Sequence, residues 1–164
     1  MGVTRRRFLA RAGVAIVSIA AGGACARSAT AGPAVDYEVT HSDAEWKQLL
    51  TAAQYDVLRH AGTESPYSSP LNDEHRRGVF SCAGCAVDLF SSDTKFDSGT
   101  GWPSFWKPLD HAVIEQPDDS LLMTRTEVLC RRCGGHLGHV FDDGPQPTGL
   151  RYCMNGVAMT FRPA

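Results

Sequence analysis

Two Cys-x-x-Cys pairs constrain the fold of this chain more than any other feature. The pairs are Cys82/Cys85 and Cys130/Cys133, with 44 residues between them. Each pair offers two thiolates from one tight turn, and two such turns supply the four ligands of a tetrahedral zinc site. We therefore expect the fold to bring two distant turns together around one Zn²⁺ ion per chain.

Four thiolate ligands leave a zinc ion no open position for water or a substrate, so the expected role of the metal is structural. The alternative interpretation is two disulfides, because the amino-terminal residues indicate export to an oxidising compartment.

The first 31 residues have the composition of an export signal. Three consecutive arginines at residues 5–7 precede an apolar run from about Val14 to Ala21, and small residues follow. The arginines are typical of the twin-arginine type of signal. The apolar run is shorter than the roughly 20 residues that a membrane-spanning helix needs. We therefore predict that residues 1–31 are cleaved and that the protein is exported across the cytoplasmic membrane to a bacterial periplasm.

Cys25 lies within this signal. Two Ala-x-Ala exits, at residues 24–26 and 29–31, would both remove it. The alternative keeps Cys25 as a lipidated first residue and anchors the protein to the membrane, but Gly22 and Gly23 stand where a lipoprotein signal normally has a bulkier aliphatic residue. A thiolate zinc site fits the twin-arginine route, because folded proteins use it and the metal can be bound in the reducing cytoplasm.

The remaining chain is long enough for one domain with a core. We expect an extended lead-in at residues 32–41 and a domain at residues 42–164. The full chain has 16 basic and 18 acidic side chains, and five arginines lie in the signal, which leaves 11 against 18 and a net charge of -7. Nucleic-acid binding depends on neutralising phosphates with lysine and arginine. This charge therefore argues against a nucleic acid, and equally against an anionic membrane surface, as a partner.

Helices are expected only at the amino end of the domain. Capping-box patterns begin at Ser42 and Thr51, each followed by apolar residues at helical spacing. They predict two short helices that pack on a sheet through Trp46 and Leu58, with Gly62 ending the second helix.

The rest of the domain consists of short apolar runs between turn signals. These runs predict strands at residues 78–82, 87–90, 113–115, 121–125, 139–141, 150–154 and 158–161, with a loop at 62–72 and a turn at 117–120. Many short strands of this kind indicate a mainly β domain.

Cys153 is the one cysteine of the domain outside the two pairs. Arg151 and Asn155 flank it at a spacing of two, which places all three side chains on one face if the segment is a strand. A reactive thiolate needs such a positive charge or hydrogen-bond donors. The segment therefore predicts a nucleophile in a cleft. The alternative is a buried cysteine that acts as a small hydrophobe beside a solvated arginine.

Two histidines and a tryptophan are further candidates. His136 and His139 lie in a glycine-rich segment, and a histidine can deliver a proton near neutral pH; either histidine can instead cap a turn. Trp102 lies between Gly101 and Pro103, which favours a rigid turn with the indole at a pocket edge, although a tryptophan is more commonly part of the core.

In this order, the motifs resemble the methionine-R-sulfoxide reductases of the B type. The resemblance extends from about Trp46 to Phe161 and rests on the cysteine pairs and on Arg59-x-x-Gly62-Thr63-Glu64, Lys95-Phe96-Asp97-Ser98-Gly99 with Gly101-Trp102-Pro103-Ser104-Phe105, Gly135-His136-Leu137-Gly138-His139-Val140-Phe141, Asp143-Gly144-Pro145 and Arg151-Tyr152-Cys153-x-Asn155. It implies a fold of two antiparallel sheets with short amino-terminal helices, and a structural zinc far from the active site.

The resemblance also implies the roles of the site residues. Cys153 attacks the sulfur of methionine-R-sulfoxide while His139 protonates the departing oxygen, and Cys153 becomes a sulfenic acid. Trp102 holds the substrate methyl group, and Phe141 is a second substrate-binding residue. The hydrogen-bond network around them is completed by His136, Asp143, Arg151 and Asn155.

The sequence departs from the family pattern at two positions. Many relatives have a resolving cysteine just before Gly-Trp-Pro, where this chain has Thr100, and Gly156 stands where serine is common. With four cysteines on zinc and Cys25 removed, no internal thiol remains to reduce the sulfenic acid. The expected partners are therefore oxidised proteins or peptides that contain methionine-R-sulfoxide and an external thiol, either a thioredoxin-like protein or a small thiol. The expected form is a monomer.

The leading hypothesis is a reductase that repairs oxidised proteins under oxidative stress, and two other functions are alternatives to it. A catalytically inactive, zinc-ribbon-like binding module is favoured by the absence of a resolving cysteine. A thiol-disulfide oxidoreductase that uses one cysteine pair would contain no zinc. A binding module has little need for His136, His139, Arg151 and Asn155 together, so these residues favour the reductase.

Overall fold

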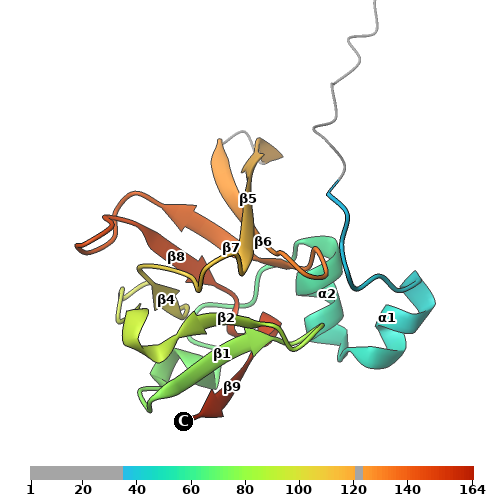
Figure 1. The fold of residues 1–164 in the computed structure, drawn as a ribbon, viewed down its shortest axis with the longest axis horizontal. Helices are drawn as coiled ribbons and strands as arrows, with labels where there is room; N and C mark the ends of the chain where they lie inside the picture. Colours follow the sequence, from blue (N-terminus) through green and yellow to red (C-terminus); the bar gives the residue numbers. More distant parts are fainter. Residues whose placement is uncertain (1–34, 121–123) are drawn as a thin grey trace, which may run out of the picture. The chain divides into compact units, whose positions relative to one another are not determined.

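The computed structural model describes residues 35–120 and 124–164. The predicted signal at 1–31 lies outside these residues. Two antiparallel sheets account for most of the regular secondary structure of the described residues (Figure 1). The smaller sheet has the order β2-β1-β9 and comprises β1 (Gly78–Cys82), β2 (Asp88–Ser91) and β9 (Met159–Pro163). The larger has the order β3-β4-β8-β7-β6-β5 and comprises β3 (Lys95–Phe96), β4 (Ser104–Phe105), β5 (Val113–Asp118), β6 (Arg125–Cys130), β7 (His136–Phe141) and β8 (Arg151–Met154).

The prediction of a mainly β fold with two antiparallel sheets and short helices is confirmed. Short 3-10 turns lie before β1 at Pro70–Asp73, between β2 and β3 at Ser92–Thr94, and between β8 and β9 at Gly156–Ala158. Within the described residues, no helix reaches the length and apolar content that a bilayer-spanning helix requires.

Both predicted helices form, as α1 (Asp43–Leu49) and α2 (Ala52–His60). The side chains of Ser42 and Thr51 accept hydrogen bonds from the first turns of the helices, which completes both capping boxes. The end of α2 differs from the prediction, because Ala61 and not Gly62 takes the left-handed conformation, at φ 53°. Trp46 and Leu58 are buried, and α2 packs against β7.

The predicted turn at residues 117–120 begins too early. Strand β5 continues through Pro117 to Asp118. Proline is tolerated there because β5 is the edge strand of its sheet, so the missing N–H does not remove a bond to a second neighbour. The strand predicted at 121–125 lies largely outside the described residues, and β6 begins at Arg125.

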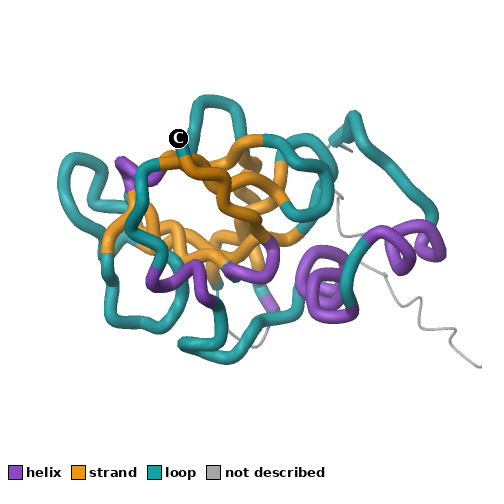
Figure 2. The backbone as a smooth tube through the Cα atoms, turned by 90° about the horizontal axis from the view of Figure 1, so that it is seen from below, coloured by secondary structure: helices purple, strands orange, loops and turns teal. Residues whose placement is uncertain are grey.

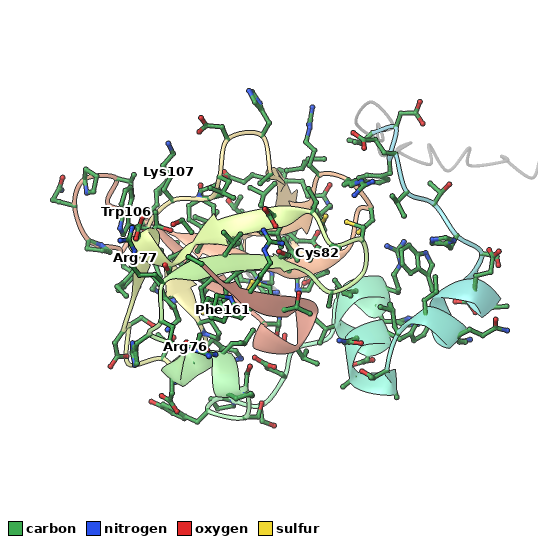
Figure 3. All side chains as sticks on the ribbon, turned by 60° about the horizontal axis from the view of Figure 1, so that its bottom comes forward. Arg76, Arg77, Cys82, Trp106, Lys107 and Phe161 are labelled. Atoms are coloured by element: carbon green, nitrogen blue, oxygen red, sulfur yellow. The ribbon has the colours of Figure 1, made fainter. Side chains whose placement is uncertain are left out.

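Aromatic side chains fill the interior between the sheets. The Phe105 ring of the larger sheet stacks on Phe90 at 4.4 Å and contacts Phe80 edge-on at 4.9 Å. Figure 2 shows the strands gathered around this interior, with the two helices together at one side. At the margin of the smaller sheet, Arg76 lies over the ring of Phe161 at 5.3 Å (Figure 3). The same core holds strand β8 in position, because the inward side chain of Tyr152 on β8 packs near Phe90.

Candidate active site

Cys153 lies at the centre of the larger sheet, on β8 between β4 and β7. Its inward neighbours Tyr152 and Met154 are buried in the core, so Cys153 faces the opposite side of the sheet. Across the β7–β8 ladder its direct partner is His139. Directly opposed side chains in an antiparallel pair have Cβ atoms about 5 Å apart. The sheet thus sets the candidate nucleophile and the candidate acid side by side.

A pocket of about 160 Å³ opens over these two residues. Two aromatic side chains, Trp102 and Phe141, give it apolar walls. Its lining consists of Thr63, Trp102, Arg125, Gly138, His139, Phe141, Cys153 and Asn155. Five of the residues singled out in the sequence therefore meet here: Cys153, His139, Trp102, Phe141 and Asn155.

Burial raises the pKa of the Cys153 thiol, and neighbouring donors act against this rise. The Thr100 hydroxyl lies 3.8 Å from Cys153 Sγ, and Thr100 is linked through Ser98 to Ser104 by hydroxyl contacts of 2.8 and 2.7 Å. The Thr100 and Ser104 hydroxyls and the charge of Arg151 act in the lowering direction, but the pKa of Cys153 stays above its ordinary value. The resting thiol is therefore mostly protonated but has several groups that favour the thiolate.

Arg151 lies on the same face as Cys153, two residues earlier on β8. Its guanidinium donates two hydrogen bonds of 2.8 Å to the Asp143 carboxylate and lies 4.4 Å from the centre of the Phe141 ring. Asp143 thus acts on the site through Arg151, since it does not line the pocket itself.

Each histidine pairs with a carboxylate from another strand of the same sheet, Glu127 of the adjacent β6 for His136 and Asp118 of β5, one strand further, for His139. His136 is buried and contacts Glu127 through Nδ1 at 2.6 Å. His139 contacts Asp118 through Nε2 at 2.8 Å. The two imidazole rings lie 5.4 Å apart, edge to face. Of the two histidines, only His139 lines the pocket, so the structure separates their positions in a way that the sequence does not.

Glu64 connects the substrate side of the pocket to the nucleophile side. Its carbonyl oxygen accepts from Trp102 Nε1 at 3.1 Å, and its N–H donates to the Asn155 side chain at 3.0 Å. Its carboxylate accepts from the backbone N–H groups of Gly156 at 2.6 Å and Val157 at 2.9 Å. One loop residue therefore holds the indole and the turn that follows β8.

Sequence reasoning gave no role to several residues that line or support the pocket, including two in a loop motif and three on the larger sheet. Thr63 and Glu64 belong to the Gly62-Thr63-Glu64 motif, so a signal existed for them. The other three lie on β5 and β6, and no local pattern marks them as neighbours of His139: Asp118, Arg125 and Glu127.

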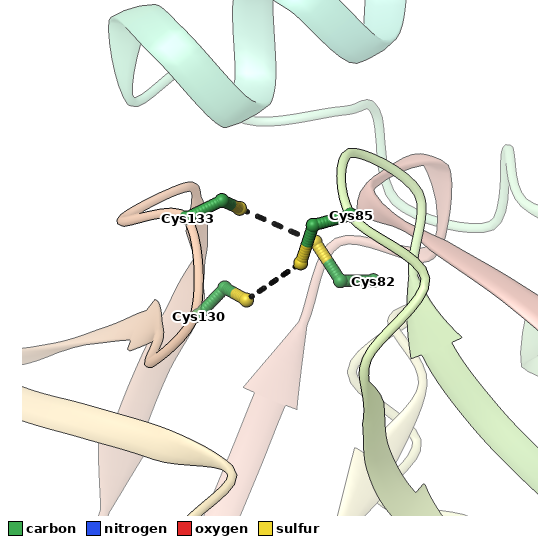
Figure 4. Close-up of side chains that lie close together, drawn as sticks. All are labelled: Cys82, Cys85, Cys130 and Cys133. Carbon is green, nitrogen blue, oxygen red and sulfur yellow. Dashed lines mark hydrogen bonds between the residues drawn. The ribbon is translucent and has the colours of Figure 1, made fainter. Parts of the chain in front are cut away.

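The other four described cysteines form a separate cluster, and none of them lines the pocket. Their sulfur atoms all lie within 4.8 Å of one another. The closest approaches join the two sequence pairs, at 3.7 Å from Cys82 to Cys133 and 3.5 Å from Cys85 to Cys130 (Figure 4). None of the four forms a disulfide. The predicted meeting of the two turns is confirmed, and the cluster is a candidate metal site.

A mainly β domain with one partly buried thiol beside a histidine in an aromatic pocket, and with a separate four-cysteine cluster, has a candidate enzyme site and a candidate metal site. Comparison with known proteins identifies the family. A family model described as the SelR domain matches residues 50–163.

Three relatives with high identity carry the name peptide methionine sulfoxide reductase MsrB. The protein from Leptospira interrogans is 52% identical over 129 residues, which cover 78% of this chain and 98% of the relative. That from Agrobacterium fabrum is 53% identical, with 77% and 94% covered, and that from Methanosarcina barkeri is 54% identical, with 76% and 88% covered. The chain therefore belongs to the MsrB family of SelR-domain proteins, and the predicted family is confirmed.

Proposed function

We propose that this protein reduces methionine-R-sulfoxide in oxidised proteins or peptides to methionine, with Cys153 as the nucleophile. The observation that carries this proposal is the position of Cys153 directly opposite His139 in a pocket walled by Trp102. The names of the relatives support it, since each is a peptide methionine sulfoxide reductase.

The pocket suits the end of a methionine sulfoxide side chain. Its volume of about 160 Å³ admits a small group, and the Trp102 and Phe141 rings offer apolar surface to a methyl group. The indole is held in place by its hydrogen bond to the Glu64 carbonyl. A methyl group that packs on these rings leaves the sulfoxide sulfur to face Cys153.

The reduction transfers one oxygen atom. The Cys153 sulfur attacks the sulfoxide sulfur, the S–O bond of the substrate breaks, and the oxygen ends on Cys153 as a sulfenic acid. The substrate sulfur gains the two electrons that the cysteine sulfur loses. The proton of the thiol ends on the sulfenic oxygen, with His139 as the group that transfers it. Arg151 favours the thiolate that attacks.

The sulfenic acid is then reduced by an external thiol. Thr100 contacts Cys153 where the family resemblance predicts a resolving cysteine in many relatives, and the other four described cysteines lie together in the cluster. One external thiol displaces the oxygen as water and forms a mixed disulfide with Cys153, and a second thiol releases Cys153. A thioredoxin-like protein and a small thiol both satisfy this chemistry.

The four-cysteine cluster fits a structural zinc ion. Four sulfur ligands at about 2.3 Å from zinc in a tetrahedron lie about 3.8 Å from one another, and the two closest sulfur contacts here are 3.5 and 3.7 Å. Cys82, Cys85, Cys130 and Cys133 would hold the ion. When bound, it joins the turn after β1 to the turn between β6 and β7.

The proposal includes export. The arginines at residues 5–7 and the short apolar run that follows favour a twin-arginine signal with a periplasmic destination. Sequencing the amino terminus of the secreted protein checks this. A mature chain that begins directly after position 26 or 31 supports export with cleavage. A lipidated Cys25 as first residue would instead indicate export with membrane anchoring. An intact Met1 in a cytoplasmic protein contradicts export.

Turnover of the separated methionine sulfoxide epimers tests the activity. The zinc-loaded protein with excess dithiothreitol is expected to reduce the R epimer only, and Cys153→Ser to lose this activity. Failure of the folded protein to reduce either epimer would reject catalysis and favour a binding module.

A further inference from the structure

Asp118 has a position at the active site that the proposed mechanism does not use. Its Oδ2 atom lies 2.8 Å from His139 Nε2 and 2.7 Å from an Arg125 guanidinium nitrogen. Its Oδ1 atom accepts the backbone N–H of Ser120 at 2.9 Å. The side chains of Asp118 and His139 are only 16% and 15% exposed. Three donors therefore hold this carboxylate against the edge of the pocket.

These donors keep Asp118 ionised. Hydrogen bonds from Ser120 and His139, together with the charge of Arg125, hold the pKa of Asp118 well below its usual range. An ionised carboxylate only accepts hydrogen bonds. The His139 nitrogen that faces it, Nε2, must therefore carry a hydrogen, and neutral His139 has its lone pair on Nδ1.

His139 Nδ1 is thus the nitrogen left for chemistry. Within residues 35–120 and 124–164, it has no hydrogen-bond partner, while the ring lines the same pocket as Cys153. A lone pair at this position can take the proton of the thiol, and the resulting imidazolium can give it to an oxygen.

We propose that Asp118 is a positioning residue that fixes the orientation and tautomer of His139, so that Nδ1 passes the Cys153 proton to the sulfoxide oxygen. The inference rests on the proposed reductase activity. Its proton balance is that of the overall reaction: one proton leaves the thiol, occupies Nδ1, and ends on the sulfenic oxygen. No additional acid is consumed.

The charges around His139 suit a transient acid. Burial lowers its pKa, Arg125 and His136 lower it further, and Asp118 acts in the opposite direction. Neutral His139 is thus the resting form at neutral pH, and Asp118 stabilises the imidazolium when the thiol proton arrives. The charged and titratable groups around it come from its own strand and from three others of the sheet: His136 of β7, Arg125 and Glu127 of β6, Asp118 of β5, and Cys153 with its diagonal neighbour Arg151 of β8.

The tautomer can be measured without turnover. In ¹⁵N-labelled protein above neutral pH, long-range ¹H–¹⁵N spectra should show His139 with hydrogen on Nε2, assigned by its loss in His139→Asn. In Asp118→Asn, a mixture of tautomers and a lower His139 pKa are expected, because the charge that stabilises the imidazolium is gone. Hydrogen on Nδ1 in the unmodified protein would overturn the proposal, whether or not the protein is active.

Kinetics provide the second test, with Asp119→Asn as the matched control. Asp119 is the adjacent carboxylate, is exposed, and bonds only to Thr124 among the described side chains. Asp118→Asn is expected to lower kcat for the R epimer about tenfold or more, with KM changed less than about twofold, whereas Asp119→Asn should leave both unchanged. Equal kcat in the two variants would contradict a role for Asp118. Absence of activity in the unmodified protein would reject the reductase function. The tautomer measurement would then still test whether Asp118 fixes the orientation of His139.

Discussion

The Oγ1 atom of Thr100 lies 3.8 Å from Sγ of Cys153. The family resemblance predicts a resolving cysteine at this position in many relatives, and the structure shows that a side chain here reaches the proposed nucleophile. A cysteine at position 100 would therefore lie beside Cys153 without a change in the backbone.

Thr100→Cys is expected to restore an internal resolving thiol. After one turnover without reductant, the introduced thiol should form a disulfide with Cys153, because a thiol at contact distance attacks the sulfenic acid faster than a dilute external thiol. Mass spectrometry after dimedone treatment measures the difference: the unmodified protein carries the dimedone adduct of a sulfenic acid and the variant does not. Thr100→Ser keeps a hydroxyl and serves as the control. Dimedone labelling of Thr100→Cys at the level of that control would contradict the expectation.

Arg151→Met is expected to make Cys153 less reactive near neutral pH. The guanidinium lowers the pKa of Cys153, so its removal raises that pKa and reduces the thiolate fraction below it. The rate of iodoacetamide alkylation against pH measures the change, and its midpoint should move to higher pH. Arg77→Met removes an exposed arginine without a side-chain partner among the described residues and should leave the midpoint in place. An unchanged midpoint in Arg151→Met would show that Arg151 does not contribute to the pKa of Cys153.

Glu64→Gln is expected to weaken both stability and substrate binding. The Glu64 carboxylate accepts two backbone N–H groups after β8, and an amide replaces one acceptor with a donor. A mismatch of this kind at a partly buried site costs about 1–3 kcal/mol in the free energy of unfolding, which urea denaturation measures. KM should rise because the same loop holds Trp102. Asp93→Asn removes the charge of an exposed carboxylate and serves as the control. If Glu64→Gln has the same free energy of unfolding and the same KM as this control, Glu64 does not organise the pocket.

Metal removal is expected to unfold the part of the chain that the cluster joins. Thiol titration of the native zinc-loaded protein should find one reactive cysteine, Cys153, and titration after chelation and denaturation should find all five of the described cysteines. The melting temperature should fall on chelation, because binding of a structural metal contributes directly to folding. Acid should have the same effect, since protonated thiols release zinc. Five reactive thiols before chelation, together with a melting temperature that does not fall on chelation, would mean that no metal is bound.

Local rules explain what the sequence predicted well. A capping box joins residues three apart, so Ser42 and Thr51 mark helix starts without reference to the rest of the chain. Where the prediction was wrong, the tertiary structure had changed the local preference. Pro117 is part of a strand because β5 is an edge strand, and Ala61 takes the left-handed turn in place of Gly62.

The sequence by itself determined the two cysteine pairs, the alternation of Arg151 and Cys153 on one strand face, and the family. Only the tertiary structure decided which groups meet His139 and Cys153. Asp118 is 21 residues from His139, and Glu64 is 91 residues from Asn155. Such contacts depend on strand order, on register and on the bulge between Val128 and Leu129, which are set by how two sheets pack around one core and not by any short stretch of residues.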